Sequence, residues 1–158
     1  MAAPVATVRG TPTGIKLVDG FPSKITFALL PNVELWEKSV KPPGIDGGDG
    51  IPQTTMLNTK WHTFAPRKLL KLTDATAKCA YDPSCYQSLL SIININTTVT
   101  VTFGDGSTLA FFGFLKMFDV SELAEGAQPE ATVTIFPTNF DPVNRTEEPP
   151  VLTSVPGT

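Results

Sequence analysis

Two segments of the chain alternate strictly between apolar residues and threonine, over residues 98–103 and 131–135. A period of two is typical of a strand that buries one face and leaves the other face solvated. The first segment is followed by Gly-Asp-Gly at 104–106, which predicts a tight hairpin turn, and then by a phenylalanine-rich strand over 108–117. The pattern therefore predicts a three-stranded antiparallel unit, in which an acidic connector at 119–130 precedes the last strand.

Weaker patterns on the N-terminal side predict two further strands and one helix. Residues 23–30 alternate in the same way, and residues 33–40 follow them after a Pro-Asn turn, so we expect the pair to form a hairpin. Asp82 is a favoured N-cap residue, and Pro83 stands at the favoured first helical position. Apolar residues then recur at helical spacing, which predicts an α-helix over about 82–94.

Proline and glycine divide the chain into regions of different character. A stretch rich in both predicts a long loop or hairpin over about 41–66, after which residues 69–80 are expected to return as a strand. Residues 1–22 and the proline-rich 140–158 are expected to form extended arms on either side of a single domain, 23–139. These elements predict a mainly β fold, an antiparallel β-sandwich or barrel with one flanking α-helix.

Composition limits the classes of function. Of the 158 residues, 17% are charged, which is below the roughly 25% of an ordinary soluble domain and favours a chain that covers part of its surface with partners. The formal net charge of −3, without a basic patch interleaved with aromatic residues, argues against electrostatic binding of nucleic acid. No signal-peptide pattern and no apolar run of membrane-spanning length is present, so we expect reduced cysteines and no membrane partner.

The charges are unevenly distributed along the chain. Residues 63–81 carry four basic residues against one acid, whereas residues 119–130 carry four acids and no base. These two segments are either ordinary solvated faces or complementary patches between identical subunits. The second interpretation assigns subunit contacts to Lys71, Lys78, Glu122 and Glu125.

No catalytic or metal-binding constellation emerges. His62 is the single histidine and could serve a cysteine nucleophile, but a structural histidine is the simpler interpretation. The spacing of Cys79 and Cys85 is not that of a zinc site. The aspartates and glycines of 46–50 could suit a hard cation, yet they occur once and lack the bidentate glutamate of an EF-hand. We therefore expect no enzyme activity, no cofactor and no bound metal.

Three segments resemble, in the same order, parts of the major tail tube protein of long-tailed bacteriophages. They are GIDGGDGIPQTTMLNTKW at 44–61, YDPSCYQSLLSIININTTVTVTFGDGSTLAFFGFLKMF at 81–118, and EGAQPEATVTIFPTNFDP at 125–142. The motifs that carry the resemblance are Tyr-Asp-Pro opening a helix, the Asp-Gly-Ser hairpin, and the closing Pro-Thr-Asn step. Together they cover about half of the chain.

The resemblance implies a structural virion protein. In that family six copies form a ring whose inner sheets join into one β-barrel, and the rings stack into a hollow tail tube. The tube surrounds a tape-measure protein during assembly, contacts tail-tip or baseplate and terminator proteins at its ends, and later conducts DNA without binding it specifically. The implied location is the virion tail, with assembly in the host cytoplasm.

The resemblance also implies roles for particular residues. The long loop is expected to reach an adjacent ring or subunit through Gly44, Ile45, Asp46, Ile51, Met56 and Trp61. The solvated threonine faces suit a wet channel with few charges, and the expected lumen-facing residues are Thr98, Thr100, Thr102, Thr132 and Thr134.

Other functions remain open on the sequence. One is a different virion β-structure, such as a tail terminator or a capsid decoration protein, which shares strands and self-association. Another is a monomeric ligand-binding β-sandwich, with a pocket lined by Trp36 or Trp61. A hydrolase is a third possibility, but the sequence lacks the residues for it.

Overall fold

The computed structural model describes residues 22–33 and 35–154. It is mainly β, and these residues contain one helix, α1 (Pro83–Ile92). The main strands are β1 (Lys24–Phe27), β2 (Trp36–Lys41), β7 (Ala75–Ala80), β8 (Thr97–Thr102), β9 (Thr108–Val120) and β10 (Glu130–Pro137). The short ones are β3 (Ile45–Asp46), β4 (Ile51–Pro52), β5 (Phe64–Ala65), β6 (Lys71–Leu72), β11 (Phe140–Asp141), β12 (Thr146–Glu147) and β13 (Val151–Thr153).

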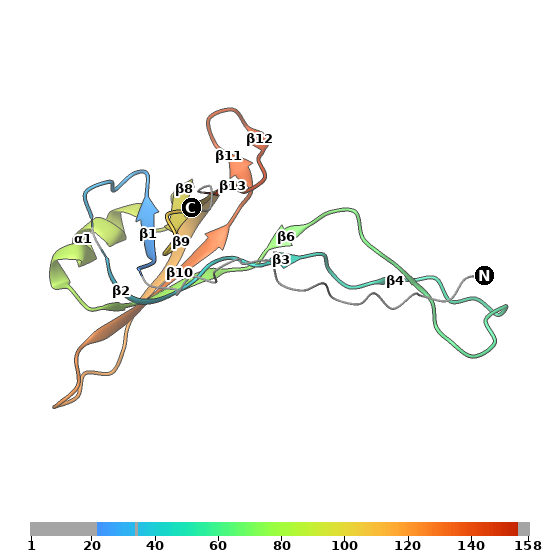
Figure 1. Cartoon of the computed structure of the whole chain (residues 1–158), viewed down its shortest axis with the longest axis horizontal. Coiled ribbons are helices and arrows are strands. Elements are labelled where there is room, and N and C mark those ends of the chain that lie inside the picture. The colour runs from blue at the N-terminus through green and yellow to red at the C-terminus, as the bar shows by residue number, and fades with distance from the viewer. Residues whose placement is uncertain (1–21, 34, 155–158) are drawn as a thin grey trace.

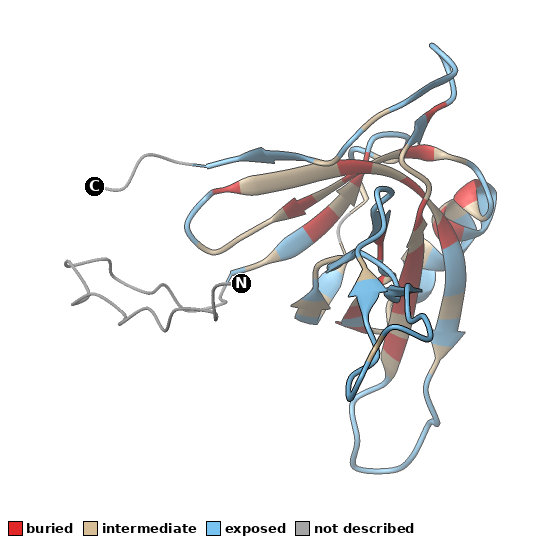
Figure 2. Cartoon of the chain, turned by 90° about the vertical axis from the view of Figure 1, so that its right-hand side faces the viewer, coloured by how far each residue is buried: buried red, intermediate tan, exposed pale blue. Residues whose placement is uncertain are grey.

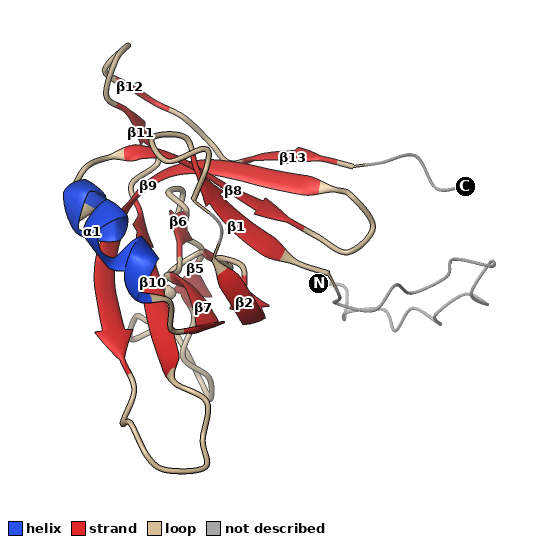
Figure 3. Cartoon of the chain, turned by 90° about the vertical axis from the view of Figure 1, so that its left-hand side faces the viewer, coloured by secondary structure: helices blue, strands red, loops and turns tan. Residues whose placement is uncertain are grey.

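One seven-stranded antiparallel sheet forms the body, in the order β1-β8-β9-β10-β7-β2, with β13 paired to the first part of β9. The sheet curls into a half-barrel, and α1 lies at one of its ends (Figure 3). This architecture confirms the fold class expected from the sequence. Strands β8, β9 and β10 are consecutive neighbours, as the alternating pattern predicts, and Gly106 takes the positive φ (91°) of the hairpin turn.

Strand β9 holds the two halves of the sheet together. Its first half pairs with β8 and β13, its second half pairs with β10, and a register shift between Thr134 and Ile135 lets the strand pair bend. Gly113 lies where the two halves meet. A Cβ atom there would come within 2.8 Å of the Phe136 carbonyl oxygen, so only glycine lets β10 approach this closely.

The core is formed by buried residues of the central strands and of α1, which are red in Figure 2. Alternate residues of the central strands point into it, among them Val99, Val101, Val133 and Ile135, and α1 covers them with Leu89 and Ile92. The helix begins as expected, because the Asp82 side chain accepts a hydrogen bond from the Ser84 backbone N–H (3.0 Å). That carboxylate's bonds to Ser84 lower the pKa of Asp82.

The hairpin expected from 23–30 and 33–40 is wrong. Strand β1 pairs with β8, and β2 pairs with β7, so the two strands stand at opposite ends of the strand order. Ile25 and Phe27 of β1 are buried in the core beside β8, whereas no residue of β2 is buried, so β1 gains its burial from the central strands and not from β2. The connection between β1 and β2 therefore leads from one edge of the sheet to the other.

The expected strand over 69–80 is divided between β6 and β7. Most of the predicted N-terminal arm, 1–22, lies outside the described residues. Residues 140–153, expected to lie in an extended tail, contain the small β11–β12 hairpin and β13, which adds to the sheet beside β9. Only residues 155–158 of that segment are not described.

A long two-stranded ribbon leaves the body between β2 and β7 (Figure 1). We call residues 44–73 the arm, and this name does not include the terminal arms expected from the sequence. Its paired segments are β3–β6 and β4–β5, and the chain reverses at residues 53–63, which we call the arm tip. The long loop or hairpin expected over 41–66 is thus a ribbon whose return strand continues to Leu72.

Gly113→Ala should destabilise the body by about 1–3 kcal/mol, since the added methyl group would overpack the crossing of β9 and β10. Chemical unfolding of the purified protein measures this effect. Gly47→Ala is the matched control, because its Cβ would meet nothing closer than 4.0 Å. Equal stability of the two variants would contradict the role given to Gly113.

Candidate assembly surfaces

The arm is anchored to the body by hydrogen bonds at its base. The Thr73 N–H donates to the Gly44 carbonyl oxygen, and the Gly44 N–H donates to Thr73 Oγ1; each donor–acceptor distance is 2.8 Å. Leu72 is buried in the core beside this clamp. Farther out, Arg67 Nε donates to the Asp49 carbonyl oxygen (2.7 Å) and joins the two strands between their paired segments. The arm therefore leaves the body in a defined direction.

Polar bonds shape the arm tip. Asn58 Oδ1 accepts from the Thr55 N–H (2.9 Å), and Asn58 Nδ2 donates to the Trp61 carbonyl oxygen (2.8 Å). Thr54 Oγ1 accepts from the Thr63 N–H (3.1 Å) and lies 3.2 Å from His62 Nδ1. These bonds tie the loop across itself without using any apolar side chain.

The apolar side chains of the arm are left in solvent. Trp61 is 81% exposed and Met56 is fully exposed, so the tip presents large apolar groups that contact little of their own chain. The set of exposed large apolar residues on the arm is Ile45, Ile51, Met56, Leu57, Trp61, Phe64, Leu69 and Leu70. An exposed apolar surface of this kind marks an interaction site.

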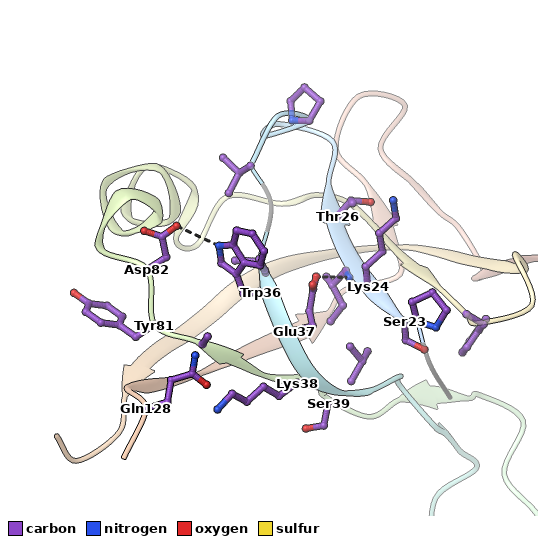
Figure 4. A pocket seen from close by; sticks show the side chains of 18 of the residues that line it. Ser23, Lys24, Thr26, Trp36, Glu37, Lys38, Ser39, Tyr81, Asp82 and Gln128 are labelled. Carbon is purple, nitrogen blue, oxygen red and sulfur yellow. Dashed lines mark hydrogen bonds between the residues drawn. The ribbon is translucent and has the colours of Figure 1, made fainter. Parts of the chain in front are cut away.

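A groove lies where the two edge strands of the half-barrel approach each other. Its walls come from β1, β2 and the start of α1, and its volume is ≈ 1320 Å³ (Figure 4). Glu37 bridges the gap, since its Oε1 accepts from the Ile25 backbone N–H (3.0 Å). Trp36, 61% exposed, stands at the rim and donates from Nε1 to Asp82 Oδ2 (3.4 Å).

The structure brings together only some of the residues predicted to make subunit contacts. Those on the arm are Gly44, Ile45, Asp46, Ile51, Met56, Trp61 and Lys71, all exposed. Glu122 and Glu125 are exposed in the β9–β10 loop, which projects at the end of the molecule away from the arm (Figure 1).

Lys78 belongs to neither group. It lies on the body strand β7, where its charge helps to lower the pKa of Glu130, although the main cause is the hydrogen bond from Lys38 (2.7 Å). Lys78 therefore acts on Glu130, a neighbour across the β7–β10 pair.

The five predicted lumen threonines share the face of the sheet that points away from the core. Thr98, Thr100 and Thr102 are half-buried on β8, opposite in direction to the buried valines between them. Thr132 and Thr134 take the same face of β10, but Thr134 is only 8% exposed. Between the two groups lies a half-buried aromatic strip of Phe112, Phe114 and Phe136.

The contact residues predicted from the sequence did not include four of the exposed apolar residues of the arm, namely Leu57, Phe64, Leu69 and Leu70. Their segment has no regular period, so nothing in it distinguishes side chains that face solvent from side chains that face a core. The one signal of their exposure was the high content of glycine and proline in the segment, because a segment of this composition does not build a core that could bury them.

The structure does not assemble the chemistry considered for an enzyme or a metal site. His62 is exposed on the arm tip, whereas Cys79 is buried in the body, where burial raises the pKa of its thiol to about 12. Within the described residues, no cluster of three or more histidine, cysteine, aspartate or glutamate side chains could hold a metal ion. The same part of the chain has no helix of the length and apolarity needed to cross a membrane.

Comparison with known proteins gives a likeness in fold. No family model matches the sequence, and no curated protein matches it either. Among solved structures, the chain is similar to a chain of the six-fold symmetrised cryo-EM structure of the anti-feeding prophage (AFP) baseplate. The TM-score is 0.59 at 9% sequence identity, and the match covers 94% of this chain and 99% of that chain. At this identity the match describes the fold alone.

Proposed function

We propose that this chain is a structural protein of a phage-tail-like particle. In this proposal it assembles into six-membered rings that stack into a hollow tube, and DNA passes through the tube. The arm carries the proposal, because an ordered ribbon with fully exposed apolar side chains has its use in contact with other subunits.

The edges of the sheet also favour assembly. The half-barrel ends in two edge strands, β1 and β2, and open edges favour pairing with another chain unless they are covered or closed. A ring of copies removes open edges by closure, and a head-to-tail contact between rings extends the assembly without limit. The body and the arm supply one surface for each kind of contact.

The fold likeness supports the same proposal. The matched chain belongs to a six-fold symmetrised baseplate, and the match spans nearly the whole of both chains. A fold shared along almost the full length is the kind of evidence expected for components that occupy related positions in tail-like particles.

The partners follow from this position in the particle. The chain would bind copies of itself, a tape-measure protein during growth, and baseplate or tail-tip and terminator proteins at the two ends. DNA would pass along the threonine face, whose β8 part offers uncharged hydroxyl groups to a phosphate backbone. Assembly would take place in the host cytoplasm, and the finished product would be the virion tail.

A second candidate is a ring at the end of a tube, and it is favoured by the matched chain, which comes from a baseplate. The two candidates differ in whether purified protein grows beyond one ring. Negative-stain electron microscopy of the full chain decides between them.

Tubes of variable length are the expected result of that microscopy, because a head-to-tail stacking contact has no built-in stop. Discrete rings would favour the terminal-ring candidate over the tube. Monomers alone at every protein concentration would contradict both and leave the monomeric ligand-binding β-sandwich.

Lys71→Glu should slow the growth of assemblies at low salt, and Glu122→Lys with Glu125→Lys should restore part of the growth rate. The physical reason is that exposed charges on the arm and on the β9–β10 loop steer subunits together, and salt screens this effect. Light scattering during assembly measures it.

Arg145→Glu serves as the control for that experiment, since it makes the same charge change on the β11–β12 turn. Growth that slows equally in the control would assign the effect to net charge. Absence of any rescue at low salt would remove the proposed pairing of the two surfaces.

Thr100→Cys, placed in a Cys85→Ser background, should react in assembled particles with a small maleimide but not with one carried on a large polymer. A lumen-facing residue is open to small solutes only, whereas an outer residue is open to both. Val143→Cys in the same background is the control and should accept both reagents. Labelling of the Thr100→Cys assemblies by the large reagent would contradict a lumen lined by this face.

A further inference from the structure

We infer that the arm tip of one copy docks into the groove between β1 and β2 of another copy. The inference rests on the proposed function, because it names the surface that receives the arm. It is drawn from four observations on the described residues: the chemistry of the tip, the chemistry of the groove, their positions in the molecule, and their charges.

The arm tip is an ordered loop with exposed apolar side chains. Asn58 and Thr54 hold the loop through the four polar contacts described above, three of which involve backbone atoms, and this loop carries Met56, Leu57 and Trp61 outward. A loop that is ordered before binding loses less conformational entropy when it binds. Tryptophan and methionine are also residue types enriched in protein interfaces.

The groove offers the matching cavity. Half-buried apolar residues form much of its wall, namely Val33, Leu35, Val40 and Phe103. Leu35, Val40 and Phe103 are packed against the core on one side and border the groove on the other. The volume of ≈ 1320 Å³ exceeds the roughly 300–1,000 Å³ of a small-molecule pocket and suits a short piece of protein chain.

The positions of the arm and the groove in one copy require the contact between them to be intermolecular. The arm extends from one end of the longest axis of the molecule, whereas β1, β2 and the start of α1 lie toward the other end (Figure 1). One copy therefore cannot fill its own groove with its own arm. A contact between different surfaces of two identical copies is heterologous, and it repeats from copy to copy.

Polar groups at the rim suit the tip as well. Lys60 is exposed immediately before Trp61 and can approach the Asp82 carboxylate. The other charged groups that line the groove are Lys24, Glu37, which accepts from the Ile25 N–H, and Lys38, which is paired with Glu130. Trp36 at the rim is exposed enough to pack against an incoming aromatic ring, an arrangement that contributes beyond area burial. Neither Lys60 nor the Asp82 carboxylate takes part in the two ion pairs found among the described residues.

Cross-linking of defined pairs tests the inference. Ser39→Cys copies place a thiol at the groove, Met56→Cys copies place one at the tip, and both are made in a Cys85→Ser background, with Cys79 buried. Mixed under assembly conditions and treated with a short bismaleimide, they should give a covalent pair. Val143→Cys copies replace the Met56→Cys copies in the control, since this exposed side chain belongs to neither surface.

The expected result is a groove-to-tip product that exceeds the control product by on the order of tenfold, because docking raises the effective concentration of the two thiols.

In uncross-linked protein, Trp61→Ala should raise the concentration needed for assembly by about 30-fold, as expected for a central tryptophan anchor. Val143→Ala should leave that concentration unchanged.

Failure of this inference differs from failure of the proposed function in electron micrographs of the same mixtures. Rings or tubes without a groove-to-tip product would overturn the docking site and leave assembly in place. A product that forms only between two tips would also overturn it. Absence of any assembled particle would overturn the docking site together with the proposed function.

Discussion

The close crossing of β9 and β10 at Gly113 determines the shape of the body. Because β10 approaches to within contact of the β9 backbone there, one strand can serve two halves of a sheet and bend between them. The bend curls the sheet into a half-barrel, and α1 at one of its ends completes the core with Leu89 and Ile92. The bend also brings the two edge strands near each other without joining them, and that gap is the groove.

The body and the arm follow different physical rules. In the body, apolar side chains alternate inward and are covered, so burial stabilises the fold at roughly 25 cal/mol per Å² of apolar surface. In the arm, backbone pairs and the Asn58 and Thr54 bonds hold the shape, and the large apolar side chains remain in water. The apolar surface of the arm is therefore left to be buried against another chain, as the proposed assembly requires.

Local signals in the sequence predicted the body well. Alternation located β8, β9 and β10, and the Asp82 cap located α1, because these features depend on nearest neighbours. The pairing of β1 and β2 was beyond such signals, since it depends on which distant strand buries Ile25 and Phe27 best. The exposed apolar surface of the arm could be suspected but not mapped, because an irregular segment has no period that separates the two faces.

If the chain assembles through its arm, sedimentation velocity of the full chain over a range of concentrations will reveal it. We expect the 16.9 kDa species to give way to much larger particles as concentration rises, and Trp61→Glu to shift this transition to higher concentration. A single 16.9 kDa species at every concentration, in both proteins, would show instead that the exposed arm does not drive self-assembly.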